Sequence, residues 1–347
     1  MKSNNNDFSE ILKTDKCLII AEVAQAHDGS LGTAHAYIDA IEKTGADAVK
    51  FQTHIAAAES TPDEPWRIKF SPQDKTRFEY WKRMEFSEEQ WAGLKKHANE
   101  RNLMFLSSAF SNEAFDLLNR IGVAAWKVAS GEVTNTVMLN RMLKSGLSIL
   151  LSTGMSPIDE IDRIVNKINQ HGNDYAVLQC TSMYPAPPEK LGLNMLSIFK
   201  DRYNCPVGLS DHSGNIYAGL AAASLGASIL EVHVTFSRDC FGPDVPASIT
   251  TDELHQLVEG LKFINTALSN PVSKEDMAEE LSPMRQLFTK SIVVNRDLEK
   301  GTILTEAMLS LKKPGDGLPP GKMNELIGKK LKVDLPKDTR VKENDLE

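Results

Sequence analysis

The 347-residue sequence is poor in cysteine and has no two cysteines at CxxC spacing. Its four cysteines are scattered, at Cys17, Cys180, Cys205 and Cys240. Cys17 and Cys180 lie inside apolar, strand-like stretches, where a thiol is usually buried and inert. This cysteine usage excludes both a disulfide framework and a cysteine-ligated zinc site.

Long apolar runs and an excess of positive charge are also lacking. Apolar runs such as residues 148–152 are far shorter than the roughly 20 residues of a membrane helix, so we expect no membrane partner. A formal net charge of −8 without a long basic tract argues against nucleic acid as a partner. The first 16 residues are polar and lack the apolar core of a signal peptide, so we expect a cytoplasmic protein.

Short apolar stretches alternate with segments of helical periodicity from residue 17 to about 270. Near-continuous apolar strands are typical of a parallel sheet that helices cover on both faces. An open, doubly wound sheet usually carries GxGxxG after its first strand, and this sequence does not. The pattern therefore predicts an α/β fold, a (β/α)₈ TIM barrel. The expected strands are 17–24, 48–52, 103–110, 125–130, 148–154, 175–182, 206–212 and 228–235.

Two segments break this rhythm. Residues 56–85 are rich in Pro, Trp, Arg and Lys, and we expect a long loop over the barrel mouth. After about residue 283, short strand-like pieces (291–295, 326–334 and 339–342) alternate with turns. We therefore predict an N-terminal extension (1–16), a catalytic barrel (17–272), a charged linker (273–282) and a small, mostly β domain (283–347).

Polar side chains follow every predicted strand at its carboxyl end, where barrel enzymes place their chemistry. Lys50 and Lys127 are embedded in apolar strands, so their charges need partners. With the neighbouring hydroxyls and a glycine turn they predict a pocket for an anion. A Schiff-base aldolase, with one lysine as nucleophile, is the alternative.

His212 and His233 end two adjacent strands, so their imidazoles can meet at one metal ion. Two imidazoles with water and a carbonyl oxygen suit Mn²⁺ or a similar divalent ion acting as a Lewis acid. A pair of hydrogen-bonded structural histidines is the alternative. We expect the metal, because both residues stand at strand ends.

Motifs at these strand ends resemble the N-acetylneuraminate (sialic acid) synthase family. The matching strings are IIAEVAQAHDGSLGTA (19–34), GADAVKFQTH (45–54), KVASGE (127–132), LSTGM (151–155), QCTSMYPAPPE (179–189), GLSDHS (208–213), LEVHVT (230–235) and FGPDVPAS (241–248). Residues 291–318 resemble the antifreeze-like (SAF, β-clip) domain that ends these enzymes.

The resemblance implies a transferase that condenses phosphoenolpyruvate with an N-acylamino-hexose such as N-acetylmannosamine, giving a sialic-acid-type sugar and phosphate. Mn²⁺ would lie on His212 and His233, with Mg²⁺ or Co²⁺ as alternatives, and Glu22 would stand near the reacting carbon. Phosphoenolpyruvate would contact Lys50, Ser108, Lys127, Ser130, Ser152, Gly154, Ser182 and Ser210. The further substrate-binding residues would be Gln52, Thr53, Glu132, Tyr184, Asp244 and, from the partner chain of a domain-swapped homodimer, Lys313.

The sequence departs from the family at several of these positions. Val232 stands where the family usually has arginine, and Lys312-Lys313 stands where Lys-Arg is usual, which removes a possible two-pronged contact to the sugar. Acceptors of the legionaminic or pseudaminic type, or a role in spore-coat or surface polysaccharide synthesis, are therefore alternatives within the family. Outside it, the alternatives are the Schiff-base aldolase and a non-catalytic sugar-binding barrel.

Overall fold

The structure is a computed structural model and describes residues 8–12 and 16–347. The chain divides into two compact units between Ser269 and Asn270, close to the predicted end of the barrel at residue 272. We call them the barrel unit and the tail unit and describe each by itself. No helix in the described ranges is long and apolar enough to cross a membrane. The cytoplasmic location stays a prediction.

Eight parallel strands form the barrel, as predicted. The spatial order is β3-β2-β1-β8-β7-β6-β5-β4, with parallel pairing along it. Between β3 and β4 the Ala124 amide donates to the Phe105 carbonyl oxygen at 3.1 Å, which brings the two ends of the sheet together. The strands are β1 (Leu18–Ala24), β2 (Ala48–Thr53), β3 (Met104–Ala109), β4 (Trp126–Val128), β5 (Ile149–Ser152), β6 (Tyr175–Cys180), β7 (Val207–Asp211) and β8 (Ile229–Thr235), with the short β9 (Ile249–Thr250) beside β8.

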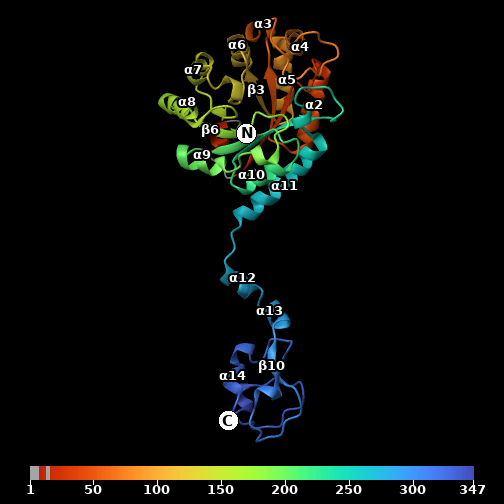
Figure 1. Cartoon of the computed structure of the whole chain (residues 1–347), viewed down its shortest axis with the longest axis vertical. Coiled ribbons are helices and arrows are strands. Elements are labelled where there is room, and N and C mark those ends of the chain that lie inside the picture. The colour runs from red at the N-terminus through yellow and green to blue at the C-terminus, as the bar shows by residue number, and fades with distance from the viewer. Residues whose placement is uncertain (1–7, 13–15) are drawn as a thin grey trace. The chain divides into compact units, whose positions relative to one another are not determined.

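Helices surround these strands (Figure 1). Their ends follow capping residues: Ser30 accepts from the Thr33 amide at the start of α2, and Gly45, at φ 81°, ends it. The helices are α2 (Leu31–Thr44), α5 (Glu88–Glu100), α6 (Asn112–Ile121), α7 (Thr136–Lys144), α8 (Ile158–His171), α9 (Met195–Tyr203), α10 (Tyr217–Ser224) and α11 (Thr251–Ser269). Short 3₁₀ turns lie at Ser130–Glu132, Pro188–Lys190 and Val245–Ala247.

Side chains alternate between two sides of the barrel wall. In β1, Leu18 and Ile20 belong to an apolar cluster inside the barrel, whereas the residues between them pack beneath the helices. Glu22 is the next inward position, and its register partners are Lys50 and His233. The barrel interior therefore changes from apolar to ionic toward the carboxyl ends of the strands.

A short helix closes the opposite end of the barrel. Helix α1 (Phe8–Ile11) precedes β1, and Phe8 and Leu12 are 2% and 7% exposed. Both belong to the apolar cluster inside the barrel, together with Ile20 and Leu106. Part of the predicted N-terminal extension thus plugs the amino-terminal end of the barrel.

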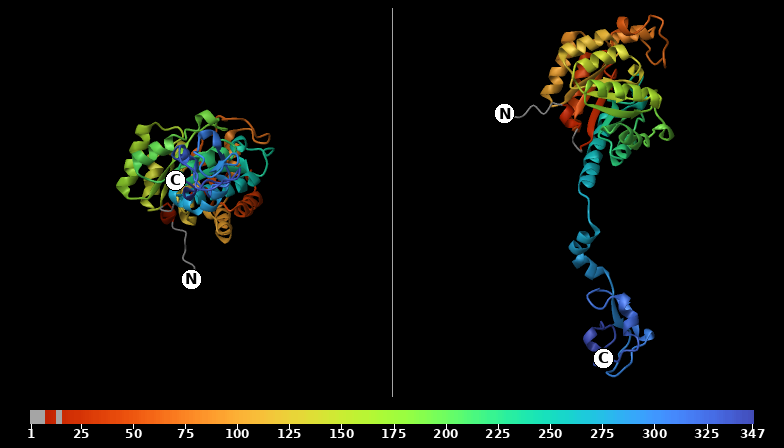
Figure 2. Two further views of the ribbon diagram at one scale, coloured as in Figure 1. Left: turned by 90° about the horizontal axis from the view of Figure 1, so that it is seen from below. Right: turned by 90° about the vertical axis from the view of Figure 1, so that its left-hand side faces the viewer.

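The connection between β2 and β3 was predicted as a loop, and this was incomplete because it contains two helices. These are α3 (Ala56–Glu59) and α4 (Arg77–Met84), and α4 begins with a capping box of Thr76 and Glu79. The connection has its own small apolar cluster around Tyr80 and Trp81. It lies at one end of the barrel unit, drawn in orange in the right-hand view of Figure 2.

The tail unit has a separate apolar core. Antiparallel strands β10 (Ser291–Val294) and β11 (Leu309–Lys312) pack with leucines from the later turns, including Leu331 and Leu346. Residues 326–334, predicted as strand-like, instead form isolated bridges after helix α14 (Met323–Leu326). The predicted linker contains helix α12 (Lys274–Glu280), and α13 (Ser282–Phe288) begins at its last residue. The remaining 3₁₀ turns are Glu306–Met308, Pro320–Lys322 and Glu343–Asp345.

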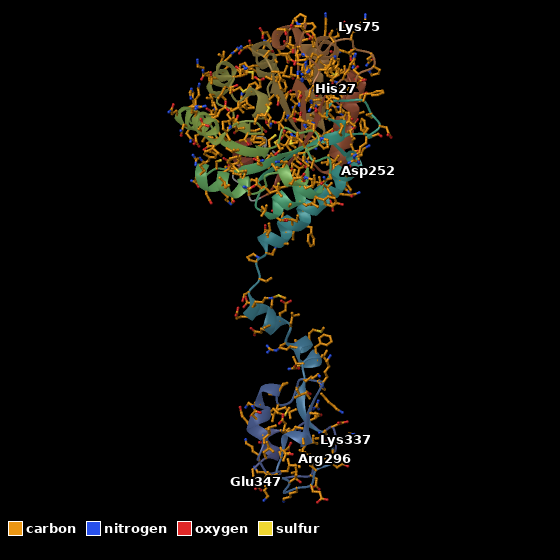
Figure 3. All side chains as sticks on the ribbon, viewed as in Figure 1. His27, Lys75, Asp252, Arg296, Lys337 and Glu347 are labelled. Atoms are coloured by element: carbon orange, nitrogen blue, oxygen red, sulfur yellow. The ribbon has the colours of Figure 1, made fainter. Side chains whose placement is uncertain are left out.

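Charged side chains cover the outside of both units. Lys75 and Asp252 on the barrel unit, and Arg296 and Lys337 on the tail unit, are exposed, whereas His27 is buried within the barrel unit (Figure 3). Buried charges are therefore unusual in this molecule, and most of them gather at one end of the barrel.

Candidate active site

A cavity of about 430 Å³ opens at the carboxyl ends of the barrel strands. Thr53 does not line it, because its hydroxyl turns to the Ser107 hydroxyl at 2.8 Å. Lys313 belongs to the tail unit. The predicted site residues that do line the cavity are Glu22, Lys50, Gln52, Ser108, Lys127, Ser130, Glu132, Ser152, Ser182, Tyr184, Ser210, His212, His233 and Asp244.

Lys50 and Glu22 form a fully buried ion pair on neighbouring strands. Lys50 Nζ also donates to the Ser108 hydroxyl at 3.3 Å, and Gln52 donates to the Glu22 carboxylate at 3.0 Å. Burial lowers the pKa of Lys50 to about 7, against the opposing attraction of Glu231. The ammonium is thus held in place by its neighbours but is poorly solvated.

Lys127 and Glu231 form a second buried pair beside the first. Lys127 Nζ lies 3.3 Å from the Glu231 carboxylate and donates to the Ser152 hydroxyl at 2.7 Å. Ser210 donates to the same carboxylate at 3.1 Å, while its other oxygen, Oε2, accepts no hydrogen bond. Burial raises the pKa of Glu231, but the two lysines and His233 outweigh burial and hold it below its usual range.

These side chains make up what we call the floor of the cavity: Glu22, Lys50, Lys127 and Glu231 with the hydroxyls of Ser108, Ser152 and Ser210. Gly154, also a predicted site residue, is not among the residues that line the cavity, but it lies next to two that are, Ser130 and Ser182. A Cβ at this position would collide with the hydroxyls of Ser130 and Ser182, so only glycine leaves the space between them open. Two ammonium groups, several hydroxyls and an open backbone position can together bind a phosphate or a carboxylate.

His212 and His233 stand side by side above the floor, with their ring centroids 5.2 Å apart. His212 Nδ1 donates to the Thr181 carbonyl oxygen at 2.8 Å, which leaves Nε2 as the acceptor nitrogen. His233 makes no hydrogen bond with any residue in the described ranges. Burial, followed by the charge of His212, lowers the pKa of His233 well below its ordinary value, so the ring is neutral.

Burial lowers the pKa of His212, but Cys180 and the Thr181 carbonyl oxygen outweigh burial and raise it above its ordinary value. The two imidazoles face one cavity and fit a divalent metal ion, whose binding would release the proton from His212. A ligating histidine usually donates its other ring N–H to a carbonyl or carboxylate, as His212 does. Among the residues that the structure describes, no group of three or more His, Cys, Asp or Glu side chains is placed to hold a metal. Water and substrate oxygens would therefore complete the coordination of an ion held by His212 and His233.

Loops build the outer wall of the cavity. The Tyr184 ring stacks on the His212 ring, with centroids 4.2 Å apart. The Arg67 guanidinium lies over the same Tyr184 ring, 4.2 Å from its centroid. Arg67 Nη2 donates to the Asp244 carboxylate at 2.8 Å and to the Pro243 carbonyl oxygen at 2.9 Å. A residue of the β2–β3 connection thus joins the connections that follow β6 and β8.

An aromatic sandwich forms another part of the outer wall. The His54 ring lies between Trp81 and Phe110, with centroid distances of 4.1 and 4.5 Å. His54 Nδ1 faces the Glu59 carboxylate at 2.7 Å. On the same side Glu132 accepts from Asn135 at 2.8 Å, and burial raises the pKa of Glu132. The outer wall is therefore aromatic and acidic, unlike the floor.

Sequence reasoning did not include Arg67, Glu231 or Glu59 in the site. Glu231 carried a usable signal, because it is two residues before His233 on one strand and so points to the same side. Arg67 and Glu59 lie in a long connection whose path over the cavity depends on tertiary packing, so no spacing rule identifies them. Lys313 in the tail unit lies 5.2 Å from the ring of the exposed Phe288, which was also not predicted.

Comparisons with known proteins agree with the geometry. The chain is 33% identical over 334 residues to the N,N'-diacetyllegionaminic acid synthase of Campylobacter jejuni, covering 94% of this chain and 99% of that one. It is 32% identical to the human N-acetylneuraminate-9-phosphate synthase, covering 94% and 92%. The crystal structure of the N-acetylneuraminic acid synthetase of Leptospira borgpetersenii superposes with a TM-score of 0.69 at 28% identity, covering 78% and 91%.

Family matches cover both units. Residues 289–347 match the SAF domain, which confirms the predicted antifreeze-like tail. Residues 37–273, well over half of the chain, match the NeuB family. The relatives are named synthases, so the chain is an enzyme of this transferase type. This chain belongs to the NeuB family of sialic-acid-type synthases.

Proposed function

We propose that this enzyme condenses phosphoenolpyruvate with the open-chain aldehyde of an N-acylamino-hexose, yielding a nine-carbon sialic-acid-type sugar and inorganic phosphate. The observation that carries the proposal is the juxtaposition in one cavity of two buried lysines and two buried histidines. The first pair suits an anionic substrate and the second suits a divalent metal. A second pocket, on the surface of α5, is lined by two lysines but by no histidine.

Phosphoenolpyruvate would bind on the floor. Its phosphate and carboxylate would exchange with Glu22 and Glu231 as partners of Lys50 and Lys127. The hydroxyls of Ser108, Ser130, Ser152, Ser182 and Ser210 and the open backbone at Gly154 would supply further donors. Hydrogen bonds between charged groups contribute about 1.5–3 kcal/mol each, so the lysines account for a large share of the affinity.

His212 and His233 would hold the metal ion, with Mn²⁺ as our first choice and Mg²⁺ or Co²⁺ as alternatives. When bound, a divalent ion at this place supplies Lewis-acid polarisation of an aldehyde oxygen. His212 is kept in the required tautomer by the Thr181 carbonyl oxygen. Tyr184, stacked on His212, offers an aromatic ring beside the pair that the sugar would contact.

The residues of this chain account for the remaining steps. A bond forms between C3 of phosphoenolpyruvate and the aldehyde carbon, and the aldehyde oxygen takes up a proton. Glu22, which accepts a hydrogen bond from Gln52, would orient the water whose oxygen adds to C2. The bond between C2 and the phosphate oxygen then breaks, and inorganic phosphate leaves with its electron pair. Gln52, Glu132, Tyr184 and Asp244 would contact the sugar.

We further propose a domain-swapped homodimer, in which the tail unit of one chain completes the site of its partner. In support, the tail unit presents Lys313 next to the ring of Phe288, which is 61% exposed. Further apolar side chains of α13 and its start are exposed, namely Leu281, Met284 and Leu287. A cation beside an exposed aromatic ring can contact the hydroxyls and the apolar face of a sugar.

Phosphate release tests the proposed function. The full-length protein is incubated with phosphoenolpyruvate and a panel of acylamino-hexoses, with and without Mn²⁺ after treatment with EDTA. We expect phosphate release that needs both an aldehyde acceptor and the metal. Release that persists after exhaustive chelation, or none with any acceptor, contradicts the proposal.

A Schiff-base aldolase is the second candidate, because a lysine whose pKa is lowered to about 7 can act as a nucleophile. Against it, Lys50 is engaged by the Glu22 carboxylate and the Ser108 hydroxyl. Borohydride treatment with pyruvate separates the two, since it traps a lysine adduct only in an aldolase. Mass spectrometry should show no such adduct at Lys50 or Lys127.

A further inference from the structure

A chain of hydrogen bonds runs along the cavity wall from Glu22 on the floor to Glu59 on the outer wall. Gln52 Nε2 donates to the Glu22 carboxylate at 3.0 Å, and Gln25 Nε2 donates to Gln52 Oε1 at 2.5 Å. The same Gln25 nitrogen lies 2.6 Å from His54 Nε2, and His54 Nδ1 lies 2.7 Å from the Glu59 carboxylate. All five side chains line the cavity. The chain thus connects the proposed reaction centre with helix α3.

One arrangement of donors and acceptors satisfies every bond in this chain. A carboxylate only accepts, so Glu22 takes an N–H from Gln52, whose oxygen then points to Gln25. The NH₂ group of Gln25 donates one hydrogen to Gln52 and the other to His54 Nε2. The ring proton of His54 is therefore on Nδ1, which donates to Glu59. Exchanging the oxygen and nitrogen of either amide, or of both, would set two acceptors or two donors against each other.

The outer end of the chain is held firmly. The His54 ring is stacked between Trp81 and Phe110, with interplanar angles of 19° and 12°, so it cannot rotate without leaving both stacks. The Glu59 side chain is 7% exposed and accepts a second hydrogen bond from the Ile55 backbone amide at 3.3 Å. Packing therefore fixes the position of the acceptor that His54 offers to the rest of the chain.

The inner end of the chain becomes important once substrate is bound. In the free enzyme, Glu22 is paired with Lys50 and accepts from Gln52. The proposed function gives Lys50 to phosphoenolpyruvate. Gln52 is then the hydrogen-bond donor that remains on Glu22 among the residues that the structure describes. The orientation of the carboxylate would therefore depend on how the Gln52 amide is held.

We infer that Gln25, His54 and Glu59 are positioning residues, which hold the Gln52 amide so that its N–H and not its oxygen meets Glu22. The inference rests on the proposed function, in which Glu22 orients the water that adds to C2. Two amides separate Glu22 from His54, and an amide N–H is not an acid at neutral pH. The chain therefore orients the carboxylate and does not carry its proton.

His54→Phe tests the inference, because phenylalanine keeps a ring between Trp81 and Phe110 but offers no nitrogen to Gln25 or Glu59. We expect kcat for phosphate release to fall at least about tenfold, a part of the about 10²–10⁴-fold that a positioned acid–base group contributes. The Kd of phosphoenolpyruvate should not change, because the lysines of the floor remain. An unchanged kcat, or a loss confined to the affinity for phosphoenolpyruvate, overturns the inference.

A double-mutant cycle shows whether His54 acts through Glu22. In a Glu22→Gln background, His54→Phe should lower kcat by less than about twofold, since the carboxylate that it positions is gone. Equal fold losses in both backgrounds would mean that His54 acts independently, and would overturn the inference. Gln25→Met interrupts the chain without touching the aromatic stack and should repeat both results. His255→Phe, exposed on α11, is the matched control and should leave kcat unchanged.

Nitrogen NMR of protein labelled with ¹⁵N-histidine measures the tautomer of His54 without turnover. One ring, identified because its signals disappear in His54→Phe, should carry its proton on Nδ1. A proton on Nε2 alone overturns the inference, whatever the activity. The expected tautomer in a protein that releases no phosphate with any acceptor would support the orientation of the chain and contradict only the proposed reaction.

Discussion

Burial and ion pairing have opposite effects on the pKa of Lys50. Burial lowers its pKa to about 7, so at pH 8 most of the ammonium is deprotonated in the free enzyme. A phosphate group bound beside it stabilises the charged form and raises the pKa. Binding of phosphoenolpyruvate should therefore be coupled to proton uptake by the protein above pH 7.

Calorimetry in buffers of different ionisation enthalpy measures this uptake. We expect close to one proton bound per phosphoenolpyruvate at pH 8 and much less at pH 6, where Lys50 already holds its proton. The phosphate itself has its second pKa near 6 and takes up no proton at pH 8. Uptake should largely disappear in Lys50→Met. Equal uptake at both pH values would contradict the assignment.

The histidine pair gives a prediction that does not depend on turnover. His212→Ala or His233→Ala should weaken Mn²⁺ binding by at least about 100-fold, because each removes half of the protein ligands. The loss of the bound-ion signal in electron paramagnetic resonance measures it. His171→Ala, exposed at the end of α8, is the matched control. Retained Mn²⁺ affinity in either site variant would show that these histidines are structural.

Most floor residues could be predicted from sequence, for a simple reason. The alternation of a strand and the barrel geometry place Glu22, Lys50, Lys127 and His233 on one side at one level. Residues of the outer wall could not be predicted in this way, and Glu132 and Asp244 were expected from the family resemblance alone. Arg67 reaches Asp244, 177 positions along the chain, through the packing of a long connection, and neither residue has a periodic pattern around it. Thr53, at a strand end, was predicted to bind substrate, and its hydroxyl instead bonds Ser107 within the wall.

Among the single elements, helix α1 contributes to stability because its side chains fill the amino-terminal end of the barrel. Phe8→Ala would leave a void beside Ile20 and Leu106 in the inner cluster. We expect a loss of about 3 kcal/mol in unfolding free energy, or roughly 6–12 °C in Tm. Phe263→Ala, at a position 76% exposed on α11, is the matched control and should change Tm little. An unchanged Tm for Phe8→Ala would mean that α1 does not contribute to the barrel core.

The element boundaries show which local signals suffice. Helices α2 and α6 begin directly after the capping residues Ser30 and Ser111, which are visible in the sequence just before segments of helical periodicity. Helices α3 and α4 were missed, although the Thr76–Glu79 capping box was visible in the sequence. Their aromatic residues pack into a separate small cluster and not against the barrel. The sequence of these helices therefore lacks the regular apolar periodicity that identifies a surface helix. In the tail unit, strands of four residues are too short for their alternation to stand out.

At the scale of the whole molecule, the proposed domain swap predicts complementation between two inactive variants. Lys313→Ala removes the tail contribution, and His212→Ala removes the metal site of the barrel. A mixed dimer of the two has one site in which both halves are intact. Mixing equal amounts should restore roughly a quarter of full activity, since half of the dimers are mixed and each has one good site.

The complementation experiment can be interpreted only if mixed dimers are shown to form. Native mass spectrometry measures their fraction, and activity should rise in proportion to it. Activity that stays at the level of the separate variants, with heterodimers present, would mean that each chain supplies its own complete site. Full activity of Lys313→Ala alone would remove the tail lysine from the proposal.

The pairing of Lys50 with Glu22 and of Lys127 with Glu231 also bears on how a catalytic cycle ends. Under the proposed function, inorganic phosphate remains on the lysines once the carbon–oxygen bond has broken. The two carboxylates are tethered beside the lysines, so they compete with the by-product at an effective concentration that dissolved phosphate does not reach. The carboxylates of Glu22 and Glu231 thus displace inorganic phosphate when they pair with the lysines again. We therefore expect dissolved phosphate to be a weak inhibitor.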